Sequence, residues 1–464
     1  MEYDVIVIGG GSGGYAAADT AQSAGAKVAI VDPGPLGGLC ILRGCMPTKT
    51  ILRSSDIMAL MQRAGEFGLS ASDIQADLSA IIDRKNRLIR EFADYRIGQL
   101  KNPRFTLIED KAAFVSPHEI KAGGKRLSAK SFIIATGSVI KKIPVPGLEE
   151  TRYITSDDVL ELKEQPESMI VLGAGPVAAE LAQFYQRIGT QVTLIQRSRH
   201  ILSFTDEDLA RPVEARLREE GMTVCTGTQL QQVSSDGKTK TVRFMHEGKE
   251  KSVSAVCILD ALGRRPNTNG LNLDAAGVEM SERGIGVDCA MRTSQPHIFA
   301  VGDVNGLHEV VHIAIQQGEV AGWNATHLDQ TAREVDERLT TNVVFTDPRV
   351  ASVGLTEKDC RKKKIEYLAA SYPFDDHGKS LCLGETHGHV KLLCDPKSGE
   401  ILGGHITGPE GGELIHQLIA VMYYKGTVRD LLTMPHYHPT LSEILTYPAE
   451  ELTGKIKQVL KKIF

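Results

Sequence analysis

The sequence predicts an α/β fold with two dinucleotide-binding domains, and two observations support this prediction. Two glycine fingerprints, Gly9-x-Gly11-x-x-Gly14 and Gly173-x-Gly175-x-x-Ala178, occur in one chain. Each follows an apolar run typical of a buried parallel strand, and each opens a helix. The chain has 464 residues, enough for roughly three domains of ~150 residues, so we expect a third region after the two fingerprints.

The first fingerprint lies in a complete strand–helix–strand unit. Residues 4–8 form the first predicted strand, Tyr15 to Ala24 the helix, and Lys27 to Val31 the second strand, which ends at Asp32. In such a unit the glycines permit a tight turn, the helix N-terminus binds a pyrophosphate, and the terminal acid binds a ribose hydroxyl. The residues therefore predict a dinucleotide site at this turn.

Helices and one further strand are predicted between the two fingerprints. Apolar residues at helical spacing lie within residues 50–100, among them Phe92, and a buried strand from Ser131 to Ile134 ends in a turn at Gly137. Residues 141–147 contain two prolines, which indicates a linker between domains.

The second fingerprint lies in a similar unit that lacks the terminal acid. Residues 169–172 and 191–195 are its predicted strands, and the helix between them ends near Ile188. Gln196 and Arg197 stand where the acid is expected. Because an arginine favours a ribose 2′-phosphate and an acid favours the free hydroxyl, we expect a nicotinamide dinucleotide, either NAD or NADP. The alternative is that Arg197 is an ordinary surface charge.

The remaining chain has a different pattern. Residues 261–267 close the second unit, and residues 293–303 read as a strand that runs into Gly302 and Asp303. Asp303 either binds a polyol hydroxyl or caps the next helix. Three strand-like stretches and a helix follow, at residues 342–345, 390–394, 401–405 and 412–424.

Two cysteines, Cys40 and Cys45, lie in a glycine-rich stretch with four residues between them. Pro47 and Thr48 favour a helix start, so Cys45 is expected near a helix N-terminus, whose dipole stabilises a thiolate. A low-pKa thiol beside a second thiol is the requirement for reversible disulfide chemistry. The alternatives are two structural thiols or half of a zinc site, and no second Cys/His pair follows nearby.

A second candidate site lies in the stretch HYHPTLSE, residues 436–443. Glu443 follows His438 by five residues, which suits an imidazole base that a carboxylate orients. The alternative is that His436 and His438 are plain loop residues.

Composition and charge exclude several classes of partner. Lys and Arg number 53 and Asp and Glu 58, so the net charge is −5, and we expect neither nucleic acid nor a membrane as partner. Because the chain goes straight into its first predicted strand, we expect neither a signal peptide nor a transit peptide. Eight cysteines are too few for a secreted disulfide scaffold, and the six outside the Cys40–Cys45 stretch read as ordinary thiols. We expect a cytoplasmic protein without a metal site.

Taken together, these motifs resemble the flavoprotein disulfide reductases of the dihydrolipoamide dehydrogenase and glutathione reductase family. The resemblance covers nearly all of the chain and rests on GGGSGG, GGLCILRGCMPTK, SFIIATG, GAGPVAAE, ALGRRPN, TSQPHIFAVGD, FTDPRVASVGLTE and HYHPTLSE. It implies two Rossmann-like domains, with FAD on the first fingerprint and NAD(P) on the second. It also implies a C-terminal α+β dimerisation domain with an antiparallel sheet, and a homodimer.

The resemblance divides the chain into four segments and implies roles for its site residues. An FAD-binding domain (1–145), an NAD(P)-binding domain (146–268), a segment completing the FAD side (269–341) and an interface domain (342–464) are expected. Cys40 would exchange thiols with the substrate, and Cys45 would contact the flavin. His438, paired with Glu443, would be the base on the disulfide of the other subunit.

Further residues are expected at the two cofactors, and Lys49 would lie near the flavin N5 and pair with Glu180. The residues expected at the FAD are Gly9, Gly11, Ser12, Gly13, Gly14, Asp32, Lys49, Ala113, Thr136, Gly137, Gly302 and Asp303. Those expected at the NAD(P) are Gly173, Gly175, Pro176, Val177, Glu180, Gln196, Arg197 and Gly263.

Within the family the chain is most similar to the dihydrolipoamide dehydrogenases. Asp19 stands where glutathione reductases carry a substrate-binding arginine, which disfavours glutathione. We therefore expect oxidation of a dihydrolipoyl group on a lipoyl-bearing carrier protein, with hydride passed to NAD(P)⁺. Two departures, Ile41-Leu42-Arg43 between the cysteines and Gln196-Arg197, leave an alternative: an NADPH-dependent reductase of another low-molecular-weight disulfide.

Overall fold

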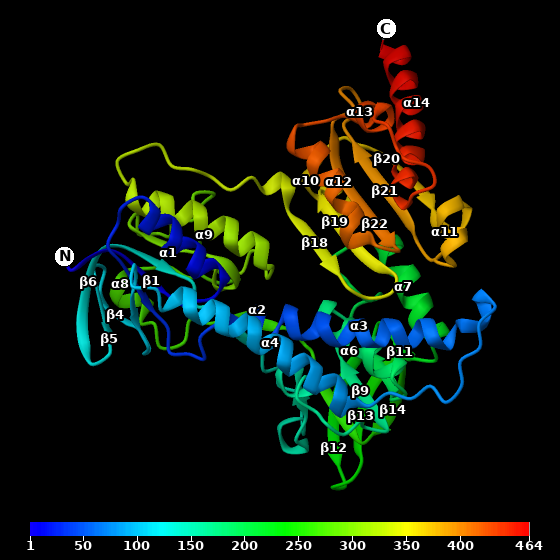
Figure 1. The fold of residues 1–464 in the computed structure, drawn as a ribbon, viewed down its shortest axis with the longest axis horizontal. Coiled ribbons are helices and arrows are strands. Elements are labelled where there is room, and N and C mark those ends of the chain that lie inside the picture. Colours follow the sequence, from blue (N-terminus) through cyan, green and yellow to red (C-terminus); the bar gives the residue numbers. More distant parts are fainter. Residues whose placement is uncertain (464) are drawn as a thin grey trace. The chain divides into compact units, whose positions relative to one another are not determined.

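The computed structural model describes residues 1–463 and forms two compact units (Figure 1). The first unit comprises Met1–Thr50, Ala80–Lys142 and Gly263–Val335. The second comprises Ile51–Ser79, Ile143–Leu262 and the chain from Asp336 onward. Each unit combines stretches that are far apart in the sequence. The expected division into four consecutive segments stays a prediction.

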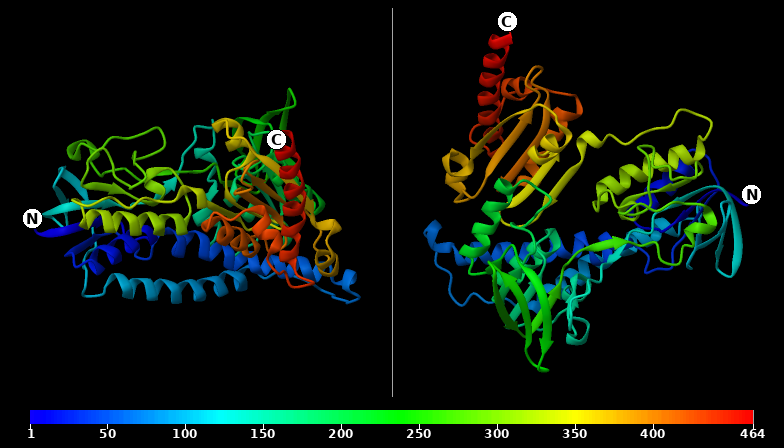
Figure 2. Two further views of the ribbon diagram at one scale, coloured as in Figure 1. Left: turned by 90° about the horizontal axis from the view of Figure 1, so that it is seen from above. Right: turned by 180° about the vertical axis from the view of Figure 1, so that it is seen from behind.

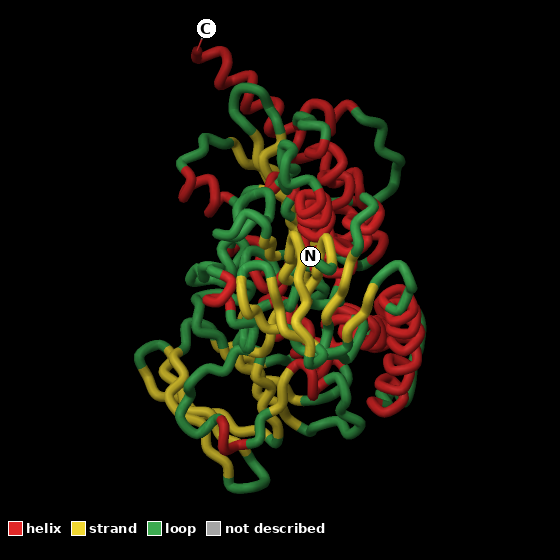
Figure 3. Tube along the Cα trace, turned by 90° about the vertical axis from the view of Figure 1, so that its left-hand side faces the viewer, coloured by secondary structure: helices red, strands yellow, loops and turns green. Residues whose placement is uncertain are grey.

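The first unit is built on a seven-stranded sheet, ordered β3-β2-β1-β6-β5-β4, in which β17 also pairs with β6. Its strands are β1 (Tyr3–Ile8), β2 (Val28–Val31), β3 (Thr106–Ile108), β4 (Ala113–Ser116), β5 (Glu119–Ala122), β6 (Lys125–Ile134) and β17 (Ile298–Ala300). The end of β6 runs parallel to β1 and β17, whereas its beginning is antiparallel to β5. Figure 3 shows these strands side by side, with the N-terminus leading into β1.

Both faces of this sheet are covered. On β1, Ile6 and Ile8 belong to one hydrophobic cluster, and Val5 and Val7 belong to another, because successive side chains of a strand point to opposite faces. The helices of this unit are α1 (Ser12–Ser23), α2 (Gly38–Arg43), α8 (Leu273–Ala276), α9 (Val311–Thr326), most of α4 (Leu78–Leu100) and the start of α3 (Cys45–Gln62). Helices α1 and α9 lie side by side (Figure 1).

The second unit contains a parallel sheet ordered β11-β10-β9-β15-β8 and an antiparallel sheet ordered β12-β13-β14. The strands are β8 (Ile154–Thr155), β9 (Ser168–Leu172), β10 (Gln191–Ile195), β11 (Thr223–Cys225), β12 (Gln229–Ser235), β13 (Lys240–His246), β14 (Lys249–Ala255) and β15 (Cys257–Asp260). The helices are α5 (Ser156–Val159), α6 (Pro176–Arg187) and α7 (Glu207–Glu219). The expected second dinucleotide-binding unit is thus present as β9, α6 and β10.

The C-terminal part of this unit is a five-stranded antiparallel sheet, which confirms the expected fold of this region. Its order is β18-β19-β22-β21-β20, with β18 (Thr341–Val344), β19 (Arg349–Gly354), β20 (Leu368–Pro373), β21 (His389–Cys394) and β22 (Ile401–Gly408). Helix α12 (Gly411–Tyr423) packs on β19 and β22, and α14 (Thr446–Ile463) packs on β20 and β21 (Figure 2). Shorter helices are α10 (Glu357–Lys363), α11 (Gly378–Leu383) and α13 (Val428–Thr433).

Short elements complete the fold. The strands β7 (Ser138–Ile140) and β16 (Arg264–Pro266) pair with each other in the first unit. The 3₁₀ helices are η1 (Ala64–Phe67), η2 (Glu149–Thr151), η3 (Gly302–Asn305), η4 (Glu337–Leu339), η5 (Phe374–Asp376) and η6 (Leu441–Leu445). Within residues 1–463, no helix is both long and apolar enough to span a membrane.

Two local expectations were wrong. The strand expected over residues 293–303 is limited to Ile298–Ala300, because Thr293 and Ile298 close a turn through two backbone hydrogen-bond contacts, Thr293 N to Ile298 O and Ile298 N to Gln295 O. Phe92, placed among the apolar positions of a packed helix, is 49% exposed.

Candidate functional site

Cys40 and Cys45 lie next to each other in the first unit. Cys40 is on α2 and Cys45 is the first residue of α3. Gly44 turns the chain between them, where an added Cβ would lie 3.1 Å from the Cys40 Cα. The two thiol side chains are hydrogen-bonded, and the backbone N–H groups of Cys45 and Met46 point at the Cys40 sulfur. The expected position of Cys45 at a helix start is confirmed, two residues before Pro47.

The protonation of the pair follows from this geometry. The pKa of the Cys40 thiol is raised, first by its hydrogen bond to Cys45 and then by burial, which disfavours the charged form. Cys45 is exposed at the N-terminal end of α3, where the helix dipole stabilises a thiolate. These contacts favour the protonated form of Cys40 in the reduced pair.

The glycine turn between β1 and α1 is open where a pyrophosphate is expected. Gly9 has a φ of +107°, and an added Cβ would collide with the Ala135 carbonyl oxygen at 2.3 Å. At Gly11, by contrast, an added Cβ would meet nothing closer than 3.9 Å, and no side chain caps α1. Open space in front of uncapped N–H groups fits the phosphates of FAD. The expected residues Ser12, Gly13 and Gly14 are the first three of this helix.

Asp32 lies beside this turn, directly after β2. Its carboxylate accepts hydrogen bonds from the backbone N–H groups of Gly10 at 2.5 Å and Gly34 at 2.7 Å. These bonds fix the side chain at the glycine turn, and a carboxylate has further lone pairs for ribose hydroxyls. The geometry therefore suits the expected role.

Asp303 is held by residues that the sequence pattern did not reveal. The Ser138 hydroxyl donates to Asp303 Oδ2 at 2.6 Å, and Arg264 Nε donates to the Ser138 oxygen at 2.9 Å. The preceding Gly302 donates its N–H to the buried Gln317 side chain at 2.7 Å. The N-cap of η3 is Val301, so Asp303 does not cap this helix. Arg264 lies in the ALGRRPN stretch, whereas no pattern marks Ser138 or Gln317.

The other residues expected at the FAD lie in the first unit. Thr136 donates its hydroxyl to the Asn267 carbonyl at 2.7 Å, and Ala113 begins β4. Lys49 is half-buried on α3. Because Lys49 and Glu180 belong to different units, their pairing stays a prediction.

The second glycine turn, between β9 and α6, repeats the features of the first. Gly173 has a φ of +97°, and an added Cβ would lie 2.6 Å from the Ala261 carbonyl oxygen. At Gly175 an added Cβ would meet no atom within 4 Å, and Pro176 begins α6 without a side-chain cap. Val177 is 42% exposed. This turn therefore fits the phosphates of a nicotinamide dinucleotide.

Polar side chains follow β10, the last strand of the second dinucleotide-binding unit. Gln196 is half-buried, and its backbone is hydrogen-bonded to Cys225 and Thr228. Arg197 and, two residues on, Arg199 are exposed. Sequence reasoning missed Arg199, although its position so soon after the strand was a usable signal. Exposed guanidinium groups at this place are available to a ribose 2′-phosphate.

Glu180 lies one helical turn into α6 and is 2% exposed. Its Oε1 accepts a hydrogen bond from the backbone N–H of Phe345 at 2.9 Å. Gly263, also expected at the NAD(P), belongs to the first unit and not to the second.

His438, in the loop before η6, lies next to Glu443 on η6. His438 Nδ1 lies 2.9 Å from Glu443 Oε1, and Glu443 Oε2 accepts the N–H of Thr440 at 2.8 Å. The pKa of Glu443 is lowered, first by the Thr440 N–H and then by His438. His436 differs, because its two ring nitrogens lie 2.8 Å from Gln417 and 2.9 Å from the Met434 carbonyl. Spacing in the sequence could not decide whether each histidine is a base or a plain loop residue. These contacts distinguish the two, because only His438 is held by a carboxylate.

The cysteine pair and His438 belong to different units, so the expected action of His438 across the subunit interface stays a prediction. Among residues 1–463, no group of three or more His, Cys, Asp or Glu side chains could hold a metal ion.

Two family models match the chain. The model described as pyridine nucleotide-disulphide oxidoreductase matches residues 3–318, and the model of that family's dimerisation domain matches residues 340–449. Together they cover both dinucleotide turns, the cysteine pair and His438.

Known proteins are similar over most of the chain. A mercuric reductase of Staphylococcus aureus is 34% identical over 92% of this chain and 78% of its own length. A dihydrolipoyl dehydrogenase of Bacillus subtilis is 33% identical over 90% of this chain and 92% of its own length. Among solved structures, the HOCl-induced flavoprotein disulfide reductase RclA from Escherichia coli matches with a TM-score of 0.83 and 25% identity, over 97% of this chain and 99% of RclA.

Proposed function

Because this chain belongs to the pyridine nucleotide-disulphide oxidoreductase family, we propose that it oxidises dihydrolipoyl groups through Cys40 and Cys45. This family uses FAD and NAD(P)H, and its dimerisation domain supports a homodimer. The observation that carries the proposal is the 2.9 Å contact between His438 and Glu443. A dithiol substrate must lose protons to react, so it needs an oriented base, whereas a metal ion does not.

In the proposed reaction, His438 Nε2 takes the proton of the first substrate thiol while Glu443 holds Nδ1 and stabilises the imidazolium. The substrate thiolate attacks the Cys40 sulfur of the oxidised pair, and Cys45 leaves as a thiolate. The helix N-terminus at Cys45 stabilises this leaving group. The result is a mixed disulfide between the substrate and Cys40.

The second substrate sulfur then displaces Cys40, which leaves the substrate oxidised to its cyclic disulfide and the pair reduced. Cys40 takes up the proton held by His438, in line with the raised pKa of its thiol, and the second substrate proton is released. Two electrons have passed from the substrate to the pair. FAD, when bound, relays these electrons to NAD(P)⁺.

We place His438 on the disulfide of the partner subunit, as the family resemblance implies. The cysteine pair would then depend on the dimer, because no site would be complete in one chain. In the same proposal, the lipoyl group that is oxidised is attached to a carrier protein.

Two other substrates define the alternatives. Exposed Arg197 and Arg199 favour an NADPH-dependent reductase of another low-molecular-weight disulfide. The mercuric reductases among the relatives, and RclA structures titled as Cu(II) complexes, suggest reduction of a metal ion at the cysteine pair.

A steady-state comparison tests the proposal. The holoenzyme is assayed with dihydrolipoamide and NAD⁺ or NADP⁺, and with NADH or NADPH against lipoamide, glutathione disulfide, Cu²⁺ and Hg²⁺. The proposal expects the highest kcat/KM with the lipoyl substrate, and its loss in Cys45→Ser. A higher kcat/KM for another disulfide or for a metal ion would contradict the proposal and support the corresponding alternative.

A further inference from the structure

One face of α6 holds the chain segment Phe345–Asp347 at three points. Glu180, Gln183 and Arg187 are spaced by three and four residues, so they lie on the same side of the helix. Glu180 accepts the N–H of Phe345 at 2.9 Å. Gln183 forms two bonds with the Asp347 backbone, donating to its carbonyl at 2.8 Å and accepting its N–H at 2.7 Å.

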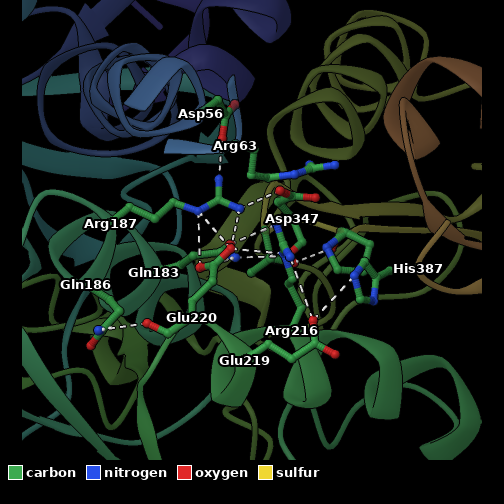
Figure 4. Close-up of polar contacts among 12 residues, drawn as sticks. Asp56, Arg63, Gln183, Gln186, Arg187, Arg216, Glu219, Glu220, Asp347 and His387 are labelled. Carbon is green, nitrogen blue, oxygen red and sulfur yellow. Dashed lines mark hydrogen bonds and ion pairs between the residues drawn. The ribbon is translucent and has the colours of Figure 1, made fainter. Parts of the chain in front are cut away.

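Arg187 completes this contact with the side chain of Asp347 and is itself fixed from three sides. Figure 4 shows its guanidinium group between Asp56, Glu220 and Asp347. The distances are 2.9 Å to Asp56 Oδ1 and 2.7 Å to Glu220 Oε1, and the side chain is 2% exposed. Burial alone would raise the pKa of Asp347, but Arg187 lowers it, so this pair stays charged.

The three contacts converge on the orientation of one carboxylate. Glu180 is buried, and a buried carboxylate adopts the orientation that satisfies it with hydrogen bonds. The Phe345 N–H is one donor, and the place of that N–H depends on Asp347, two residues further along the same segment. Gln183 and Arg187 fix Asp347, so they act on Glu180 through the backbone.

We propose that Gln183, Arg187 and Asp347 are positioning residues for Glu180 in the exchange of hydride with the nicotinamide. This inference rests on the proposed function and on the expected place of Glu180 at the NAD(P) site. It distinguishes the two halves of the reaction, because the segment Phe345–Asp347 supports the NAD(P) side and not the cysteine pair.

The test uses Asp347→Asn in the FAD-loaded dimer. Stopped-flow absorbance measures flavin reduction by NADH or NADPH and, separately, by dihydrolipoamide. Calorimetric titration measures the dissociation constant of NAD⁺ or NADP⁺. We expect flavin reduction by the nicotinamide to slow about tenfold, since small misplacements in a site have effects of this order or larger. We also expect weaker nucleotide binding, and reduction by dihydrolipoamide within about twofold of the unmodified protein.

A matched control separates positioning from general loss of stability. Glu214→Gln removes the ion pair with Arg218 (2.8 Å) within α7 of the same unit, and Glu214 forms no bond with Glu180 or with the segment Phe345–Asp347. Both half-reactions should stay unchanged in this variant. If Asp347→Asn does not fold, Gln183→Met carries the same test, because it removes both bonds to the Asp347 backbone at similar volume.

Equal slowing of both half-reactions, or no slowing of the nicotinamide half, would overturn the inference. Failure of the proposed function is seen separately, because dihydrolipoamide would then not reduce the flavin of the unmodified protein. The nicotinamide half-reaction and the nucleotide titration, compared with Glu214→Gln, then decide the inference alone.

Discussion

Nδ1 of His438 lies 2.9 Å from Oε1 of Glu443, although the His438 side chain is 81% exposed. The carboxylate is fixed by the Thr440 N–H at 2.8 Å, so it holds the imidazole in one orientation and one tautomer. This leaves Nε2 as the nitrogen that exchanges protons. An oriented imidazole on an exposed loop is suited to act on a group brought to it by another chain or by a substrate.

Replacing His438 by alanine should reduce turnover of dihydrolipoamide by about 10²–10⁴-fold, because a positioned base contributes this much. Steady-state kinetics at saturating NAD⁺ or NADP⁺ measures the loss. His436→Ala is the matched control, since His436 is bonded to Gln417 and to the Met434 carbonyl, and it should lose far less. Similar losses in both variants would show that His438 is not the specific base.

Mixed dimers should show that His438 acts across the subunit interface. A His438→Ala chain paired with a Cys45→Ser chain should keep one working site, because the intact cysteines of one chain meet the intact histidine of the other. A chain with both changes, paired with an unmodified chain, should keep none. Activity of purified tagged heterodimers measures this, and the reverse pattern would place base and disulfide in the same chain.

Replacing either cysteine by serine should abolish dithiol turnover while FAD stays bound, because the glycine turn and Asp32 do not depend on the thiols. Flavin absorbance after gel filtration measures retention of the cofactor. With the flavin oxidised and no disulfide left to form, Cys40→Ser should show the long-wavelength absorbance of a thiolate beside a flavin, and Cys45→Ser should lack it. The reverse assignment of the absorbance would exchange the roles of the two sulfurs.

Arg197→Ala should reduce kcat/KM for NADPH about tenfold and leave that for NADH nearly unchanged. Only NADPH has a 2′-phosphate to pair with a guanidinium group, and a tenfold change corresponds to about 1.4 kcal/mol, a modest value for an exposed charged hydrogen bond. Arg211, 73% exposed on α7, supplies a control variant, Arg211→Ala. Equal effects of Arg197→Ala on both nucleotides would make Arg197 an ordinary surface charge.

His405 should make the fold less stable as the pH falls from about 6.5 to about 4. The side chain is fully buried on β22, with Nε2 3.0 Å from the Leu355 carbonyl. Burial and then Lys391 lower its pKa from 6.5 to about 4. Between these values the unfolded chain binds the proton and the folded chain does not, so stability is present above pH 6.5 and is lost below it.

The expected contribution is about 3 kcal/mol from a difference of about 2.5 pH units. Urea unfolding between pH 7 and pH 4 measures it, and His405→Phe should flatten this part of the profile. The exposed His416 provides the comparison, because His416→Gln should keep the profile of the unmodified protein. An unchanged slope in His405→Phe would contradict the prediction.

The sequence by itself determined the features that depend on local spacing. A strand, a glycine with positive φ and a helix start are encoded within about ten residues, so both dinucleotide turns and the position of Cys45 were predictable. The contact between His438 and Glu443 was equally predictable, because the two residues are only five apart in the chain. The short extent of the strand Ile298–Ala300 was not predictable in this way, since it depends on the turn that Thr293 and Ile298 close.

Only the tertiary structure decided which distant residues support these sites. Ser138 lies 165 residues from Asp303, and Phe345 lies 165 residues from Glu180, so no periodicity of the chain relates the partners. These contacts form because a carboxylate that is buried, such as Glu180, or half-buried, such as Asp303, must be satisfied by whatever donor the packing of helices and sheets brings to it. Local sequence specifies where a carboxylate is placed along its own element, and the fold specifies which hydrogen bonds fix its direction.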